Sequence, residues 1–280
     1  MTAMRQSLPI DAPGAWPEFR DAPPARASRR IYAIGDVHGD IDLLGDMHAA
    51  ICDDLARHPA TRPLIVHLGD LIDRGPHSNR VIDAVIALCE RPPAGAEAMS
   101  LRGNHDNWLA GFLTDSTILP TWAPKGGLET LLSYGFTPEA VFSGLASPAS
   151  AEKVRERFLE VLPERHKEFM LGLPLCHSDG DYFFAHAGVD PDRSLADQTI
   201  EDLTWIRDKF LNSRKHFGKV VVHGHTARAF VESLPNRINV DTGIYIRQVL
   251  SCVVLDGTER HLLQVGNVSI GKPALAGEPA

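Results

Sequence analysis

The sequence is poor in cysteine. Only four occur among its 280 residues, at Cys52, Cys89, Cys176 and Cys252, and no two of them form a C-x-x-C pair. This spacing gives no indication of a disulfide framework or of a zinc site held by thiolates. We therefore expect reduced thiols, most of them buried, which are typical of a cytoplasmic protein.

Long apolar runs and an excess of basic residues are also missing. No run of about 18 apolar residues occurs, so the sequence predicts no transmembrane helix. The net charge of −8 argues against nucleic acid as a binding partner and against attachment to a membrane, because both attract basic surfaces. The hydrophobic fraction of 44% suffices for a packed core in one large domain or two small ones. Nothing in the sequence indicates an oligomeric state.

The two ends of the chain differ in composition from the rest. Residues 1–30 lack a hydrophobic block and contain acidic residues, so they resemble neither a secretory signal nor a transit peptide. They also contain several prolines. We therefore expect a mobile N-terminal arm over residues 1–30, a folded domain over 31–268, and a frayed C-terminal tail over 269–280.

The first half of the domain alternates strand-like and helix-like patterns. Apolar residues recur at steps of four from Leu43 to Leu55, which indicates an amphipathic helix that Pro59 ends. Strand, helix, strand, helix, strand along a chain predicts a parallel sheet with right-handed crossovers. The predicted elements are strands over residues 31–34, 64–70 and 98–104, with helices over 41–58 and from a Ser78 cap to Cys89.

The second half begins with an irregular helical stretch, roughly residues 107–175, and then becomes rich in strands. Thr199 to Asn212 is predicted as one further helix, and Asp256-Gly257 is a hairpin signal between the last two strands. The layout predicts two sheets packed face to face, with helices outside. The late strands lie within residues 181–188, 219–226, 237–243, 248–257 and 260–265.

Short polar clusters follow five of the predicted strands. They read GDVHG at residues 35–39, GDLIDRG at 69–75, GNHD at 103–106, HAG at 186–188 and HGHT at 223–226. Each alone is an ordinary turn sequence, just as His67, His177 and His216 are ordinary structural or solvated histidines. Ligands bind beyond the carboxyl ends of strands in open sheets. Five such clusters in successive loops therefore predict one shared site.

The donor types in these clusters indicate a metal site. Aspartate, asparagine and histidine supply oxygen and nitrogen donors, and no cysteine lies among them. This set suits Mn²⁺, Fe or Zn²⁺ and differs from a structural zinc site held by thiolates. The glycines beside the donors allow tight backbone turns and leave room for a metal and a substrate.

The order and spacing of these motifs resemble the phosphoprotein phosphatase family of metallophosphoesterases. The similarity extends from about Arg30 to Val265 and is strongest to its bacterial and bacteriophage-type serine/threonine protein phosphatases. It implies an α/β fold of the calcineurin-like type, a β-sandwich flanked by helices in four layers.

The resemblance also implies a role for each site residue. Asp36 and His38 would hold one metal ion, Asp70 would bridge, and Asn104, His186 and His225 would complete the second ion. His223 is the alternative to His225, because residues two apart on a strand share a face. Arg74 and Arg207 would bind the phosphoryl oxygens, since forked arginine donors suit that task. His105 would be the general acid, oriented by Asp73.

The reaction implied is direct attack on phosphorus by a hydroxide that bridges two divalent ions. Mn²⁺ is the expected metal, with Fe or Zn²⁺ as alternatives. The expected substrate is a phosphoserine or phosphothreonine protein, and phosphotyrosine is left open. Residues 121–135 resemble the stretch that lines the substrate side, where Lys125 would meet a phosphopeptide and Trp122 would either do so or pack internally.

Two other functions compete with this interpretation. A symmetrical diadenosine tetraphosphatase shares the early motifs and HAG, but it resembles the chain less at Arg207 and at GHT followed by NVDTG. A non-catalytic partner-binding module on the same fold would be expected to have lost metal ligands or His105, all of which are present.

Overall fold

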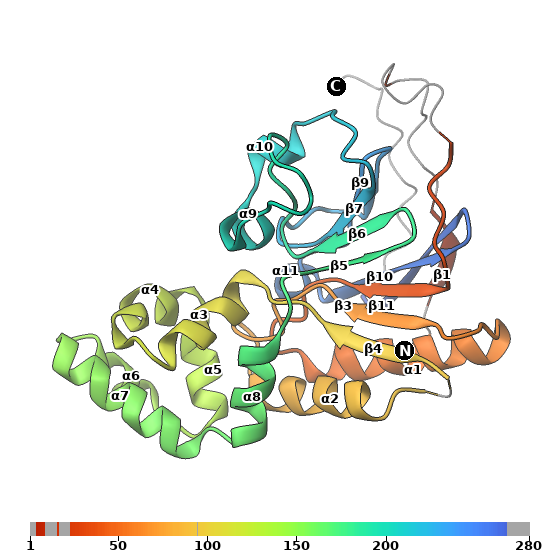
Figure 1. Cartoon of the computed structure of the whole chain (residues 1–280). Coiled ribbons are helices and arrows are strands. Elements are labelled where there is room, and N and C mark those ends of the chain that lie inside the picture. The colour runs from red at the N-terminus through yellow and green to blue at the C-terminus, as the bar shows by residue number, and fades with distance from the viewer. Residues whose placement is uncertain (1–3, 9–15, 17–22, 94, 268–280) are drawn as a thin grey trace, which may run out of the picture.

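The computed structural model describes residues 4–8, 16, 23–93 and 95–267 (Figure 1). Most of the expected N-terminal arm and the whole expected tail over 269–280 lie outside the described residues. Four residues of that arm, Met4–Ser7, form strand β1, which pairs antiparallel with β11 (Glu259–Gly266) at an edge of the first sheet.

The first sheet is mixed. Its parallel part is the predicted one, β2 (Ile31–Ile34), β3 (Leu64–His67) and β4 (Glu97–Ser100). β10 (Val249–Asp256) pairs antiparallel with β2 and forms the predicted hairpin with β11. The full order is β1-β11-β10-β2-β3-β4.

The second sheet has the order β5-β6-β7-β9-β8. β6 and β7 are parallel, as are β7 and β9, so the carboxyl ends of these three strands point to the same edge. The strands are β5 (Cys176–Asp179), β6 (Tyr182–Ala185), β7 (Val220–His223), β8 (Glu232–Ser233) and β9 (Arg237–Asn239).

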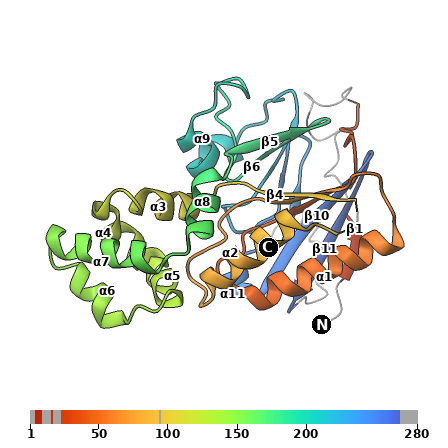
Figure 2. The same ribbon diagram turned by 60° about the horizontal axis from the view of Figure 1, so that its bottom comes forward.

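The two sheets pack face to face over a core of alternating strand residues. Ile31, Ala33 and Val66 from the first sheet meet Phe184 and Val222 from the second. The crossover helices α1 (Ile41–Arg57) and α2 (Ser78–Glu90) cover the outer face of the first sheet (Figure 2). Short helices α9 (Ile200–Trp205) and α10 (Asp208–Leu211) cover the second sheet. The predicted four-layer α/β architecture is thus confirmed.

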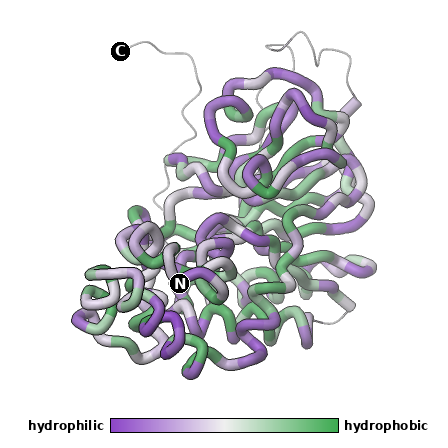
Figure 3. The backbone as a smooth tube through the Cα atoms, turned by 60° about the vertical axis from the view of Figure 1, so that its left-hand side comes forward, coloured by the Kyte–Doolittle hydropathy of each residue, from purple (hydrophilic) through white to green (hydrophobic). Residues whose placement is uncertain are grey.

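A helical subdomain, residues 104–172, lies beside the sandwich (Figure 1). Its centre contains Trp122, Phe112 and Phe158, which are fully buried. The apolar character of the sandwich strands stands out in Figure 3. In the described part of the chain, no helix combines the length and apolarity required to cross a bilayer. The α-helices of the subdomain are α3 (Asn104–Phe112), α4 (Leu119–Trp122), α5 (Gly127–Ser133), α6 (Pro138–Gly144), α7 (Pro148–Val161) and α8 (Glu164–Gly172).

Three local predictions were wrong. Ser78 does not cap α2: it is the first helical residue, and its hydroxyl accepts a hydrogen bond from the Asp73 N–H at 3.1 Å. The helix predicted over 199–212 is broken, because Arg207 has φ −132° and ψ −103° and separates α9 from α10. The cysteines are free, but only Cys252 is buried.

A buried carboxylate joins the edge of the first sheet to α1. Asp54 is fully buried and accepts hydrogen bonds from the Tyr32 hydroxyl at 2.7 Å and from Arg30 at 3.3 Å; Arg5 of β1 also pairs with it. A buried charge of this kind is tolerated only because cationic and hydroxyl groups surround it.

We expect Asp54→Ala to lower the free energy of unfolding by about 3 kcal/mol, because the buried Arg30 guanidinium loses a partner. Urea unfolding in the presence of a chelator measures this without a contribution from metal binding. Asp53→Ala, on the exposed face of the same helix, is the matched control and should change stability by less than about 0.5 kcal/mol. Equal stability of the two variants would contradict the interpretation.

Candidate dinuclear metal centre

The five polar clusters meet at one edge of the sandwich. Asp36 follows β2, Asp70 follows β3, Asn104 begins α3 just after β4, His186 follows β6 and His225 follows β7. All five side chains are buried. The parallel strands of both sheets point their carboxyl ends to this edge, as the sequence predicted for a shared site.

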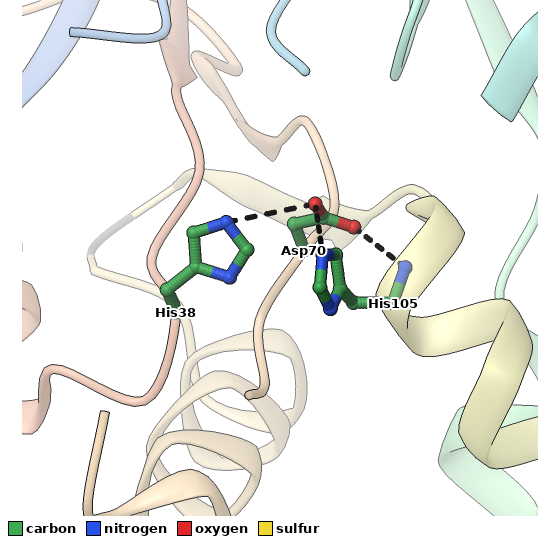
Figure 4. A group of neighbouring side chains, drawn as sticks. All are labelled: His38, Asp70 and His105. Carbon is green, nitrogen blue, oxygen red and sulfur yellow. Dashed lines mark hydrogen bonds and ion pairs between the residues drawn. The ribbon is translucent and has the colours of Figure 1, made fainter. Parts of the chain in front are cut away.

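One group of donors consists of His38, Asp70 and His105 (Figure 4). Nε2 of His38 lies 3.7 Å from Oδ2 of Asp70 and 4.0 Å from Oδ2 of Asp36. Nε2 of His105 lies 4.0 Å from the same Asp70 oxygen. The atoms of Asp36, His38 and Asp70 are therefore close enough to share a single cation, and Nε2 of His105 lies beside them.

A second group lies on the other side of Asp70. Nε2 of His186 is 3.4 Å from Oδ1 of Asp70 and 3.0 Å from Oδ1 of Asn104. The His225 ring centroid is 5.0 Å from that of His186, and His225 forms a compact donor set with Asp70 and His186. Asp70 belongs to both groups, which is the position required of a bridging ligand.

The hydrogen bonds of the imidazoles leave nitrogen lone pairs directed at the centre. Nδ1 of His38 donates to the Ile72 carbonyl and Nδ1 of His186 donates to the Leu68 carbonyl, each at 3.0 Å. This tautomer leaves Nε2 unprotonated, the arrangement typical of metal-bound histidine. Among the described residues, Nε2 of His225 is buried and has no hydrogen-bond partner.

The electrostatics of the centre also fit cations. Burial raises the pKa of Asp36 well above its usual range, and the neighbouring carboxylates of Asp241 and Asp70 raise it further. Burial lowers the pKa of His38 to about 3 and that of His225 to about 2, so both rings are neutral, as ligands must be. Crowded carboxylates and neutral imidazoles together fit a pair of divalent ions.

His223, the alternative ligand, lies outside both donor groups. Its ring packs against Phe210 behind β7, with centroids 5.0 Å apart, and its Nδ1 lies 3.0 Å from the Gly224 carbonyl. The geometry therefore favours His225, as the sequence analysis did.

Backbone strain is concentrated at this centre. In the described part of the chain, seven residues other than glycine have positive φ, a conformation that side chains of L-amino acids rarely adopt. Such strain persists where the surrounding structure fixes it and is common at functional sites. Five of the seven are predicted site residues: His38 (46°), Asp70 (52°), Asp73 (74°), Arg74 (68°) and His225 (65°).

His105 is held by a buried network that reaches into the helical subdomain. Its Nδ1 lies 2.6 Å from Oδ2 of Asp73. The same carboxylate accepts hydrogen bonds from Nε1 of Trp122 at 2.8 Å and from the Thr130 hydroxyl at 2.6 Å. Burial lowers the pKa of His105, but Asp70 and the Asp73 hydrogen bond outweigh this and raise it overall.

Trp122 is fully buried and donates its N–H to Asp73, so it is an internal residue and not a substrate contact.

The two predicted phosphate-binding arginines open onto one cleft of about 630 Å³. Nη1 of Arg74 lies 3.0 Å from Nε2 of His38 and Nη2 lies 3.2 Å from Nε2 of His105, while the guanidinium covers the Tyr245 ring at 4.1 Å. Arg207 donates to the Thr226 hydroxyl at 3.2 Å. The structure therefore places both arginines at the mouth of the donor cluster.

Comparison with known proteins agrees with this geometry. The family model of the calcineurin-like phosphoesterases matches residues 29–243. The chain belongs to the calcineurin-like phosphoesterase family.

Relatives of this phosphoesterase include nucleotide hydrolases. An asymmetrical bis(5′-nucleosyl)-tetraphosphatase, PrpE, from Geobacillus thermodenitrificans is 28% identical over 236 residues, which cover 76% of this chain and 85% of the relative. A symmetrical bis(5′-nucleosyl)-tetraphosphatase from Dechloromonas aromatica is 29% identical over 160 residues, 57% of this chain and 44% of that protein. A crystal structure of a mutant cold-active protein tyrosine phosphatase shares the fold, with a TM-score of 0.57 and 16% identity over 83% of this chain and 76% of that one.

Two buried carboxylates of this phosphoesterase were not assigned a role from the sequence. Asp106 accepts backbone hydrogen bonds from Gly103 and Asp70, both at 2.8 Å, and from Leu71 at 3.1 Å, so it ties two ligand loops together. Asp241, in NVDTG, lies beside Asp36 and accepts the Gly243 N–H at 2.8 Å. Both motifs were visible in the sequence, but only the fold shows what these carboxylates contact.

We expect Asp106→Asn to reduce metal affinity roughly tenfold to hundredfold, because an amide presents N–H to backbone groups that need an acceptor. Isothermal titration calorimetry of the metal-free protein with Mn²⁺ measures the change in metal affinity. Asp53→Asn is the matched control and should bind Mn²⁺ as the wild type does. A wild-type affinity for Mn²⁺ in the Asp106 variant would contradict the role of Asp106 in holding the two ligand loops.

Proposed function

We propose that this phosphoesterase hydrolyses bis(5′-nucleosyl) tetraphosphates by asymmetrical cleavage. The sequence analysis put phosphoproteins first and a symmetrical tetraphosphatase second, and the comparisons favour the dinucleoside substrate class. The asymmetrical relative matches three quarters of this chain and most of its own length, whereas the symmetrical relative matches less than half of its own.

The observation that carries the proposal is the cleft at the donor cluster. Its volume of about 630 Å³ lies in the range typical of small-molecule and nucleotide sites and far exceeds the need of a single phosphate. Cationic and aromatic side chains share its wall, which suits phosphates attached to a base. They are Arg74, Lys125, Arg207, Trp108, Trp205 and Tyr245.

The donor set would hold two divalent ions, and we propose Mn²⁺, with Fe or Zn²⁺ as alternatives. Asp36, His38 and Asp70 would hold one, and Asp70, Asn104, His186 and His225 the other. When bound, such ions would polarise the phosphoryl oxygens and lower the pKa of the attacking water.

The side chains of the chain itself supply binding and proton transfer. Arg74 and Arg207 bind non-bridging oxygens of the attacked phosphorus. As water bonds to phosphorus, the bond to the leaving oxygen breaks, and His105 Nε2 donates a proton to that oxygen. Asp73 keeps the other nitrogen of His105 protonated and fixes the ring.

A phosphoprotein is the second candidate substrate. Tyr245, which lies against Arg74 and lines the cleft, is 48% exposed, and the next residue, Ile246, is 71% exposed, so a peptide can contact apolar surface here. A non-catalytic binding module is disfavoured, because the donor groups, His105 and both arginines converge. Neither nucleic acid nor a membrane is proposed as a partner. A cytoplasmic location stays a prediction that rests on the free cysteines.

Product analysis tests the proposed cleavage. Diadenosine tetraphosphate incubated with Mn²⁺-loaded protein should yield ATP and AMP in equal amounts, as separated by ion-exchange chromatography. Two ADP per substrate would instead mean symmetrical cleavage. Rapid turnover of a phosphoserine peptide, with the dinucleotide left intact, would replace the proposal by the second candidate.

Replacing His105 with Asn should reduce turnover of phenyl phosphate by about a thousandfold, while the amount of bound metal stays unchanged. The loss should be larger for phenyl phosphate, whose phenoxide leaving group is a strong base that needs a proton, than for p-nitrophenyl phosphate, whose leaving group is a weak base. Steady-state kinetics on both substrates, with elemental analysis of the variant, provide the measurement. Unchanged turnover would remove His105 from the mechanism.

A further inference from the structure

Trp108 lies next to the proposed general acid, on the same face of α3. It follows His105 by three residues, and the two ring centroids are 5.0 Å apart. The structure thus places an indole ring beside the atom that would protonate the leaving group. Trp108 is partly exposed and lines the cleft.

Two other side chains continue this surface: Trp205 reaches toward the donor group, with its ring centroid 6.0 Å from that of His225, and Lys125 reaches toward the exterior. Trp205, at the end of α9, contacts Trp108 with ring centroids 4.9 Å apart. Nζ of Lys125 lies 5.1 Å from the centre of the Trp108 ring, and this side chain is exposed. All three residues line the same cleft, so an indole pair and one cation lie together on the His105 side.

The position of His105 decides which part of a substrate reaches this surface. A general acid must contact the leaving oxygen, so the leaving group lies on the His105 side of the attacked phosphorus. The groups next along that side are Trp108 and Lys125. Arg74 lies between His38 and His105, and Arg207 lies against Thr226, so both arginines border the donor cluster where the attacked phosphoryl group would bind.

We infer that Trp108, Trp205 and Lys125 form the subsite for the leaving nucleotide. This inference rests on the proposed function. The two indole rings meet edge to face, with 67° between their planes, so the base would stack on one ring and contact the edge of the other. Aromatic side chains bind bases in this way without strict base preference. Lys125 neutralises the phosphates of the same nucleotide.

Trp122 shows what a tryptophan without access to the cleft looks like in this chain. It is fully buried, and its Nε1 is engaged by Asp73. Trp108 and Trp205 differ, because each keeps part of its ring accessible from the cleft. Trp108 packs against the core with part of its ring, and the rest of the ring faces the cleft.

The test compares how well ATP and inorganic tripolyphosphate inhibit hydrolysis of p-nitrophenyl phosphate. Both inhibitors carry the same chain of phosphates, so the ratio of their inhibition constants measures the contribution of the nucleoside. Free Mn²⁺ is held constant, because both bind metal. The wild type should bind ATP at least tenfold more tightly than tripolyphosphate.

Trp108→Leu should bring this ratio close to one, because ATP loses its stacking surface while tripolyphosphate keeps its contacts. Lys125→Met should weaken both inhibitors by a similar factor, roughly fivefold to tenfold, and preserve the ratio. The controls are Phe142→Leu, which removes an exposed ring from α6, and Lys153→Met on α7. Both should behave as the wild type does.

The outcomes separate this inference from the proposed function. A wild-type ratio near one, or an unchanged ratio in Trp108→Leu, overturns the subsite even if diadenosine tetraphosphate is cleaved. Failure to cleave the dinucleotide overturns the proposed function, while the inhibition ratios still decide whether a nucleoside binds here.

Discussion

The site depends on the contacts that the buried Asp70 carboxylate makes with the imidazoles on both sides of it. It lies between the two donor groups, within 4.0 Å of imidazole nitrogens on both sides. Removing a carboxylate from water is unfavourable unless positive charge or hydrogen bonds replace the lost hydration. The Asp70 carboxylate accepts the backbone N–H of His105 at 2.9 Å. Burial raises its pKa, but the imidazoles of His186, His105 and His38 outweigh this and lower it overall. Divalent ions held by the two donor groups would stabilise the same carboxylate, so metal binding would be coupled to the local conformation of the loops.

The sandwich supplies the rigidity that this arrangement needs. Each ligand loop begins where a strand of the sandwich ends, and the strands of both sheets are fixed by the core between them. The loops adopt left-handed backbone conformations that an isolated peptide would avoid. Backbone hydrogen bonds between loops hold them there: the N–H groups of Val37 and His38 both donate to the Asp70 carbonyl, at 3.1 and 2.9 Å.

Much of the fold and of the site was predictable, because local sequence patterns determine them. The alternation of strand-like and helix-like patterns predicted the parallel core of the first sheet. The glycine-flanked donors predicted which loops come together at one edge of the sandwich. His223 and His225 do not share a strand face, because β7 ends at His223 and His225, with φ 65°, lies in a turn. The break at Arg207 and the roles of Asp106 and Asp241 depend on contacts between segments far apart in sequence. No local pattern encodes those contacts.

The carboxylate of Asp73 has a consequence for how the two parts of the molecule work together. Its oxygens receive one hydrogen bond from α4, through Trp122, and one from α5, through Thr130. The orientation of the proton donor is therefore set by the helical subdomain, while the ligand loops come mainly from the sandwich. A change in residues 119–133 would therefore act first on the orientation of His105 and not on the ligand loops of the sandwich. Any protein that exchanged these helices for another insertion would have to find two new hydrogen-bond donors for that carboxylate.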